Sequence, residues 1–291
     1  MAEGRWFRSE ASNGGTVQET LGRCIDSLLN QSALDSVVIH IVSHELPLMR
    51  FDEKLPVVLA DKPAAQPAYQ LSSAKGPEKL GVSSCIMLHF VDFPAPPDID
   101  LATYNRLSGK VLDRLPDVRR RRVGDKYSKI KVGLSAALSD PESRWVMFVD
   151  SDDLVQRDVV AWVLSHDGET TGGYTVTKGY SWRVGESFLR KVNGFYGVCG
   201  TCNIVRFSDE EKKQFIETGD VNSFDRKTHW LFAGHSSVYR RLREAGRSTN
   251  KLPFRAAVYV TGTGFNYSGI KHTGHGNVPI DEQLKFQFGI K

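Results

Sequence analysis

The sequence predicts an α/β protein in which a mixed sheet is flanked by helices. Amphipathic segments alternate with short apolar runs over residues 17–177, which is the pattern of strands joined by helices that pack on a sheet. The last third of the chain is less regular. We therefore expect one continuous domain of 291 residues, with a regular half over residues 1–165 and a less regular half over residues 166–291.

The first half begins with a predicted helix. Four apolar residues, from Leu21 to Leu29, recur at the spacing i, i+4, i+7 and i+8, which places them on one helical face. Apolar runs then predict strands at residues 37–42, 57–59 and 85–91, and residues 101–115 favour another helix.

A second amphipathic helix is predicted over residues 126–138. Its apolar positions, Ile130, Leu134, Ala137 and Leu138, repeat the spacing of the first helix. Four arginines at residues 119–122 precede it. We expect them to form a solvated turn, and the alternative is a basic surface that attracts a phosphate-bearing substrate or an anionic membrane.

The chain changes character within residues 144–153. Five of the first six residues are apolar, which predicts a buried strand, and Asp150, Asp152 and Asp153 follow directly. Ligands of open α/β sheets bind beyond the carboxyl ends of strands, and clustered carboxylates favour a divalent cation. The pattern predicts a site for a metal and a nucleotide. One acid would suffice for the alternative role, which is to cap the helix that begins near Arg157.

The second half contains shorter elements. Ser208 and Glu211 have the spacing of a capping box, and Gly219 is placed to end the helix that they begin. Residues 262–277 are rich in glycine and are expected to form a mobile loop. The other expected elements are helices near residues 159–164 and 236–245, and strands at 174–177, 202–206 and 256–260.

The composition is that of an ordinary globular protein. Its net charge of +4 and isoelectric point near 8.8 suit an anionic ligand but are too weak to indicate nucleic acid. Neither a signal peptide nor an apolar transmembrane stretch is apparent in the sequence. We expect a cytoplasmic protein, with peripheral contact to the inner face of a membrane as an option.

Three segments together resemble a known family. They are LGRCIDSLLNQ at residues 21–31, YSKIKVGL at residues 127–134 and VDSDD at residues 149–153. In this order they resemble family 2 glycosyltransferases, which have the GT-A fold with a Rossmann-like nucleotide-binding half. The resemblance covers residues 17–165 well and the remainder loosely.

The resemblance implies a metal-dependent transfer of a sugar from a nucleotide sugar, expected to be a UDP-sugar. The acceptor would be a saccharide or a lipid-linked molecule, and the transfer would invert the anomeric configuration. Residues 1–165 would bind the nucleotide sugar. Residues 166–291 would bind the acceptor and end in a lid over the site.

The family's pattern also implies roles for individual residues. Asp152 would be the main ligand of Mn²⁺ or Mg²⁺, Asp150 would hold the ribose or assist the metal, and Ser151 would lie beside them. Lys129 and Lys131 would face the nucleotide, unless they are ordinary surface lysines.

This chain departs from the family's pattern at two places. The first strand of the family is hard to find before Val17, where residues 5–8 are the nearest candidate. Glu45 stands where the family usually has an aspartate after its second strand, so we expect it near the nucleotide.

A general base is needed to accept the proton of the acceptor hydroxyl group. Asp225, His229 and His235 are the candidates, and Asp225 matches the carboxylate that the family uses. A histidine with a pKa near 6.5 would serve as well on chemical grounds. In some enzymes of this fold a late histidine joins the metal, which makes His272 a candidate ligand within the tail. A structural role is the alternative for each of these residues.

Cys199 and Cys202 form a C-x-x-C pair, which is redox-active or metal-binding in other proteins. A strand-like run follows the pair, whereas redox pairs usually begin a helix, and no second cysteine pair completes a zinc site. The family comparison implies that both are small residues in the wall of the acceptor side.

Two other functions use similar folds. A nucleotidyltransferase is disfavoured, because no glycine-rich phosphate loop with a lysine follows a first strand. A module that binds a nucleotide sugar without catalysis remains the second alternative.

Overall fold

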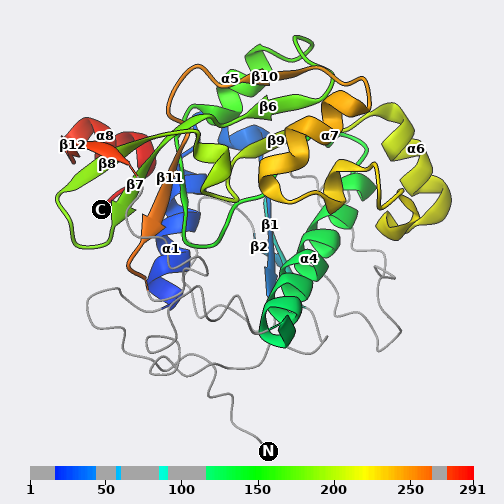
Figure 1. The fold of residues 1–291 in the computed structure, drawn as a ribbon, viewed down its shortest axis with the longest axis horizontal. Helices are drawn as coiled ribbons and strands as arrows, with labels where there is room; N and C mark the ends of the chain where they lie inside the picture. The colour runs from blue at the N-terminus through cyan, green and yellow to red at the C-terminus, as the bar shows by residue number, and fades with distance from the viewer. Residues whose placement is uncertain (1–16, 44–56, 60–84, 91–115, 264–273) are drawn as a thin grey trace, which may run out of the picture.

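The computed structural model is mixed α/β and describes most of the chain (Figure 1). The residues 5–8 proposed as a first strand, the predicted helix at 101–115, Glu45 and His272 lie outside the described residues. The described ranges are 17–43, 57–59, 85–90, 116–263 and 274–291.

The N-terminal part forms a parallel sheet of three strands in the order β1–β3–β2. The three predicted strands of the first half are confirmed within one residue at each end. They are β1 (Val38–Ser43), β2 (Val57–Leu59) and β3 (Cys85–Phe90).

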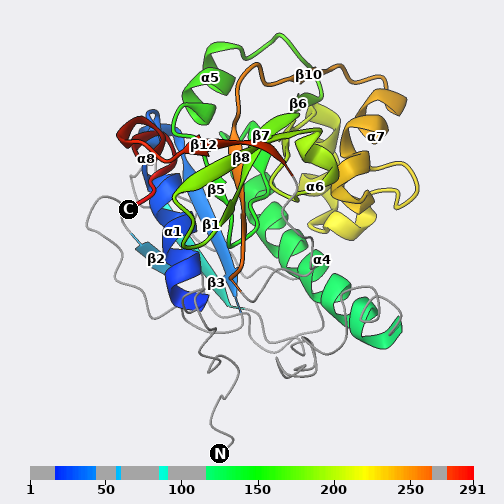
Figure 2. The ribbon, with the colours of Figure 1, turned by 60° about the vertical axis from the view of Figure 1, so that its left-hand side comes forward.

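Two helices, α1 (Val17–Leu29) and α4 (Pro116–Ser139), lie on opposite sides of this sheet (Figures 1 and 2). The predicted α1 is confirmed, since Ile25 and Leu29 are buried against Ile39 of β1. The other face of β1 meets α4, where Val42 Cγ2 lies 3.5 Å from the Cβ position of Gly133.

Helix α4 is longer than predicted. Its apolar stripe is confirmed, because Leu134, Ala137 and Leu138 are all buried. The helix begins at Pro116, a residue whose fixed φ suits the first helical position. The prediction of a turn at residues 119–122 was therefore wrong, because these arginines lie within the helix.

A second sheet has four strands in the order β10–β6–β9–β4. Its strands are β4 (Trp145–Met147), β6 (Gly173–Thr175), β9 (Asn203–Arg206) and β10 (Thr249–Lys251). Strand β4 corresponds to the predicted buried strand, but the predicted burial was wrong, because the strand is only half-buried. It runs antiparallel to its neighbour β9.

The pattern around β4 has a physical cause. Its side chains alternate between two apolar clusters, with Trp145 and Met147 in one and Val146 in the other. Each face therefore packs on core side chains, although β4 is the edge strand of the described sheet. An uninterrupted apolar run fits both an edge strand packed on two faces and a central strand.

A third sheet has five strands in the order β12–β8–β7–β11–β5. The hairpin of β7 and β8 carries several charged residues and was missed in the sequence. The strands are β5 (Leu154–Val155), β7 (Lys178–Arg183), β8 (Phe188–Asn193), β11 (Ala257–Thr261) and β12 (His275–Pro279).

The described end of the glycine-rich tail, from Gly274 onward, departs from its prediction as a mobile loop, whereas residues 264–273 lie outside the described residues. Strand β12 pairs antiparallel with β8, and the register shifts between His275 and Asn277. Helix α8 (Glu282–Phe288) follows and lies beside α1 (Figures 1 and 2). Asn30 Nδ2 donates to the Phe286 carbonyl oxygen at 2.6 Å, which joins the two helices. Pairing with distant residues, rather than local preference, orders this part of the tail.

The remaining helices follow their predicted positions. They are α5 (Val159–Ser165), α6 (Asp209–Thr218) and α7 (Val238–Glu244). The capping box of α6 is present with both of its hydrogen bonds, and Gly219 ends the helix at a φ of 65°. Within the described residues, no helix is long and apolar enough to cross a bilayer.

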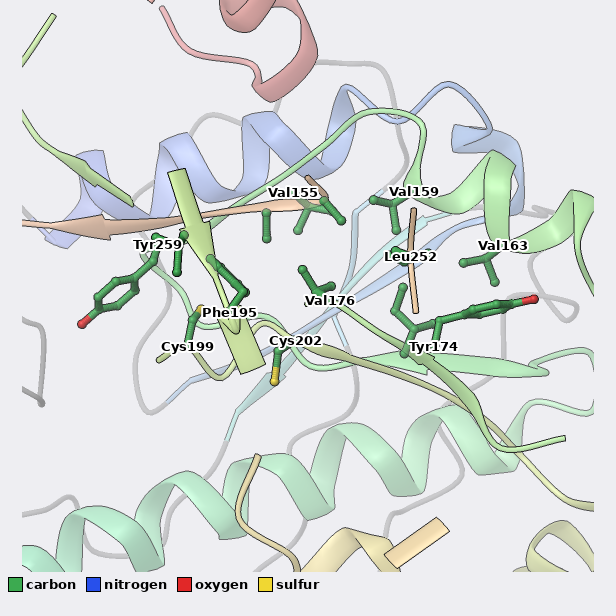
Figure 3. Close-up of a cluster of buried hydrophobic side chains, with 14 residues drawn as sticks. Val155, Val159, Val163, Tyr174, Val176, Phe195, Cys199, Cys202, Leu252 and Tyr259 are labelled. Carbon is green, nitrogen blue, oxygen red and sulfur yellow. The ribbon is translucent and has the colours of Figure 1, made fainter. Parts of the chain in front are cut away.

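The largest buried cluster lies between α5 and the second and third sheets. Figure 3 shows Val155, Val176, Phe195 and Tyr259 within it, with the side chains of Cys199 and Cys202 beside them. The side chains of Cys199 and Cys202 are thus part of the core beside residues 150–153.

Candidate functional site

Asp150 to Asp153 form a tight turn, here called the acidic turn, between β4 and β5. Because these strands belong to different sheets, the turn connects the second sheet to the third. The Asp153 amide donates to the Asp150 carbonyl oxygen at 3.0 Å, which closes the turn. Ser151 is exposed, Asp150 and Asp152 are partly buried, and Asp153 is fully buried.

Asp153 is held by donors from two distant segments. Its Oδ2 accepts from Cys199 Sγ at 2.8 Å and from Thr201 Oγ1 at 2.6 Å, and its Oδ1 accepts from the Val260 amide at 3.3 Å. Burial, followed by the charges of Asp152 and Asp150, raises the pKa of Asp153 well above its usual range. The three hydrogen bonds that it accepts give Asp153 a structural role in the acidic turn.

Asp152 lies in a different environment. Burial and the charge of Asp150 raise the pKa of Asp152 to about 6. A raised carboxyl pKa indicates negative charge that is incompletely compensated by the protein. A carboxyl pKa raised in this way is typical of sites that bind a cation or transfer a proton, although clusters of charged groups with a structural role also show it.

Lys126 on α4 supplies a positive charge to the turn. Its Nζ lies 2.5 Å from Asp150 Oδ1. Burial lowers the pKa of Lys126, but the charge and hydrogen bond of Asp150 outweigh burial and raise it. Lys126 is thus a charged neighbour of Asp150.

The sequence-based analysis missed Lys126, although a signal was present. Lys126 stands four residues before Ile130 and eight before Leu134, so it extends the apolar stripe of α4 that faces the sheets. Of the lysines predicted from the sequence, Lys129 lies off this stripe, whereas Lys131 lies at its edge, three residues before Leu134 and seven before Leu138.

The structure directs those two lysines to other partners. Lys129 Nζ pairs with Asp125 Oδ2 at 2.9 Å on the same helix. Lys131 is buried, and its Nζ donates to Asn222 Oδ1 at 2.6 Å. Neither contact involves the acidic turn, whereas the contact of Lys126 does.

Residues 199–202 wrap around the acidic turn from the other side. Besides its bond to Asp153, Thr201 Oγ1 accepts from the Asp150 amide at 2.9 Å. Gly200 lies against the Asp150 side chain, since a Cβ there would be 2.5 Å from Asp150 Oδ2. Cys24 Sγ of α1 lies 3.7 Å from the Asp150 carbonyl oxygen, within donating distance for sulfur. The sequence offered only the C-x-x-C spacing as a signal for this segment.

Of the three candidate bases, His235 is the one whose pKa responds to the charges of Lys126 and Asp150. Burial and the charge of Lys126 lower the pKa of His235, while the charge of Asp150 opposes them. Its carbonyl oxygen accepts from Asn203 Nδ2 at 2.8 Å, which ties the start of α7 to β9. The charges of Lys126 and Asp150 thus both act on the imidazole.

His229 and Asp225 have structural contacts instead. His229 Nε2 lies 2.9 Å from Glu211 Oε1, and its ring stacks on Phe224 at 4.2 Å. The exposed Asp225 accepts from the Lys227 amide and the Thr228 hydroxyl group, and these two hydrogen bonds lower its pKa. Both residues stabilise the chain between α6 and α7.

The thiols of Cys24, Cys199 and Cys202 are free and buried. Burial raises the pKa of each, and nearby aspartates add to this effect. A redox-active thiol needs a lowered pKa, so the environment of this C-x-x-C pair opposes that interpretation. Cys199 acts as a hydrogen-bond donor to Asp153.

The donor chemistry of the acidic turn suits a hard cation. Carboxylate oxygens are the ligands that Mg²⁺ and Mn²⁺ prefer, and substrate phosphates and water commonly complete their shells. Within the described part of the chain, no three or more His, Cys, Asp or Glu side chains form a group that would hold a metal alone. Asp150 and Asp152 thus provide two carboxylates that a substrate would have to complement.

Comparison with known proteins adds no family assignment. No family model matches the chain, and no curated protein matches its sequence.

Proposed function

We propose that the protein is a glycosyltransferase of the GT-A type, similar to family 2, that transfers a sugar from a nucleotide sugar to a hydroxyl group. One observation carries the proposal: Asp150 and Asp152 form a crowded pair of carboxylates beside Lys126, and the charges of Asp150 and Lys126 act on His235. The three motifs that resemble the family support it, because the α1 motif borders the acidic turn through Cys24 and the residue directly before the α4 motif, Lys126, contacts Asp150.

Asp152 and Asp150 would hold Mn²⁺ or Mg²⁺. The cation would supply charge neutralisation for the departing diphosphate without a proton. Lys126, which already lies on Asp150, would remain close to the same phosphates as a second positive charge. The raised pKa of Asp152 fits this assignment, since a bound cation would stabilise its charged form.

His235 would be the general base. The acceptor oxygen would form a bond to the anomeric carbon while the bond from that carbon to the diphosphate oxygen breaks. The proton of the acceptor hydroxyl group would pass to a ring nitrogen of His235, and the electron pair of the broken bond would leave with the nucleoside diphosphate. A lowered pKa keeps His235 neutral and ready to accept a proton at pH 7. Attack from the face opposite the diphosphate inverts the configuration.

The expected donor is a UDP-sugar, and the expected acceptor is a saccharide or a lipid-linked molecule. A panel of nucleotide sugars with Mn²⁺ should identify a donor through release of nucleoside diphosphate. The wild type, Asp152→Asn and the control Asp35→Asn, which changes an exposed aspartate on a short 3₁₀ helix, would be compared. We expect about 100-fold less release from Asp152→Asn and normal release from the control.

The outcomes separate the alternatives. Equal release by Asp152→Asn and the wild type would contradict the role of the carboxylate pair. Donor binding without release, seen as a thermal shift in the wild type, would favour a non-catalytic binding module.

A further inference from the structure

The segment Cys199–Gly200–Thr201 is poorly explained by the wall role that the family comparison implies. It contacts the acidic turn at three points, through Asp153, the Asp150 amide and the Asp150 carboxylate. We propose that Gly200 and Thr201 are positioning residues that set where the Asp150 carboxylate lies.

Thr201 fixes the backbone of the turn. Its hydroxyl group donates to the buried Asp153 at 2.6 Å and accepts from the Asp150 amide at 2.9 Å. A single hydroxyl group thus joins the first and last residues of the acidic turn. Because Asp153 is fully buried and also accepts from β11, the hydroxyl group connects the turn to the core.

Gly200 fixes the side chain of Asp150 by leaving room for it. An added Cβ would lie 2.5 Å from Asp150 Oδ2 and 3.1 Å from both its Cγ and Oδ1. The obstructed atoms belong to the end of a partly exposed side chain, which can rotate away at little cost. Alanine at this position would therefore displace the carboxylate while leaving the fold in place.

Neighbouring positions offer matched variants. Gly197→Ala is the control for Gly200→Ala, because a Cβ at Gly197 meets no atom within 4 Å. Thr201→Val removes the hydroxyl group at nearly constant volume, and Thr201→Ser keeps it.

The backbone part of the proposal is tested by hydrogen exchange of the Asp150 amide, which requires no ligand. We expect exchange at least about tenfold faster in Thr201→Val than in the wild type, with protection restored in Thr201→Ser. Equal exchange in all three proteins would overturn the role of Thr201.

The side-chain part rests on the proposed function and uses Mn²⁺ as the probe. Manganese affinity, measured by electron paramagnetic resonance, should fall about tenfold in Gly200→Ala and stay unchanged in Gly197→Ala. The thermal midpoint of both variants should remain within about 2 °C of the wild type. Unchanged affinity in Gly200→Ala, with a wild type that binds Mn²⁺, would overturn the role of Gly200.

A wild type that binds neither Mn²⁺ nor any nucleotide sugar would overturn the proposed function together with the role of Gly200 in cation binding. The role of Thr201 would then be decided by the exchange experiment alone, so the two failures are distinguishable.

Discussion

Two regions of the molecule bury carboxylates in opposite ways. Glu211 of α6 is surrounded by donors: Ser208 N, Trp230 Nε1, Arg247 Nη1 and His229 Nε2 all lie within 2.9 Å of its oxygens. In the acidic turn, three carboxylates face one another and Lys126 supplies a positive charge.

The pKa values follow this difference. Burial would raise the pKa of Glu211, but the hydrogen bond from His229 and the charge of Arg247 lower it overall. Burial and like charges instead raise the pKa of both Asp152 and Asp153. A carboxylate satisfied by the protein indicates a structural role, whereas carboxylates left crowded indicate a place where something else binds.

The largest expected effect tests the structural side of this comparison. Glu211→Ala removes the shared partner of Arg247 and His229 and leaves a buried positive charge uncompensated. We expect the free energy of unfolding to fall by about 3–5 kcal/mol in urea titrations. The control is Glu210→Ala, an exposed neighbour on α6. Equal stability of the two variants would show that Glu211 is not a structural anchor.

Two neighbouring histidines, His40 and His89, show how buried ionisable groups affect stability at acidic pH. His40 Nδ1 lies 3.0 Å from His89 Nε2 between β1 and β3. Burial and the neighbouring His89 lower the pKa of His40 to about 3, and burial lowers that of His89 to about 4. The unfolded chain binds more protons below pH 6.5, so stability is complete above that pH and falls as the pH decreases toward 4.

The expected loss is about 2 kcal/mol for each histidine at pH 5 relative to pH 8. Urea titrations at both pH values would measure it. A His40→Gln variant should lose less stability on acidification than the wild type. Identical pH dependence of the two proteins would contradict the assignment.

Substitution of His235 tests the proposed function of the acidic turn. His235→Gln should lower turnover about 100-fold, which corresponds to about 2.7 kcal/mol in the barrier, because no base would accept the acceptor proton. Wild-type activity should decline on the acid side at a pH below 6.5, as the lowered pKa of His235 requires. The exposed His275 provides the control variant His275→Gln, and equal turnover of both variants would reject His235 as the base.

The smallest expected effect comes from a direct comparison of the two buried carboxyl groups, Asp153 and Glu211. Asp153→Asn replaces one accepting oxygen of a buried carboxyl group by an NH2 group that would face a donor, and should lower stability at pH 7 by about 1 kcal/mol. Glu211→Gln removes a charge that Arg247 needs and should cost about 2 kcal/mol. Thermal or urea unfolding of both variants would show whether the order holds. A larger loss for Asp153→Asn than for Glu211→Gln would show that Asp153 is the more important structural carboxyl group.

Local signals in the sequence predicted much of the fold. The apolar stripes of α1 and α4 and the capping box of α6 depend on spacing within one helix, and all three are present. The β7–β8 hairpin was missed because its strands carry charged residues, and β12 was missed because it pairs with β8, which lies far earlier in the sequence. The antiparallel direction of β4 could not be predicted either, because an apolar run does not indicate how a strand pairs with its neighbour.

The site was predictable to a similar extent. Clustering of acids pointed to Asp150 and Asp152, and chemistry named His235 as one of three candidate bases, of which Asp225 was slightly preferred. The roles of Gly200 and Thr201 depend on a contact across about fifty residues of sequence, which no spacing rule contains. The raised pKa of Asp153 depends on its burial, so the structural role of this residue could be inferred only from the fold.

The position of the acidic turn between two sheets has a mechanical consequence. Strand β4 is anchored to β9, and β5 is anchored to β11. Any sliding of one sheet against the other therefore changes the separation of Asp150 from Asp153 and strains the Thr201 hydroxyl group that spans them. The separation of Asp150 from Asp153 thus depends on the relative position of the two sheets. A molecule that bridges Asp150 and Asp152 would oppose movement of one sheet against the other.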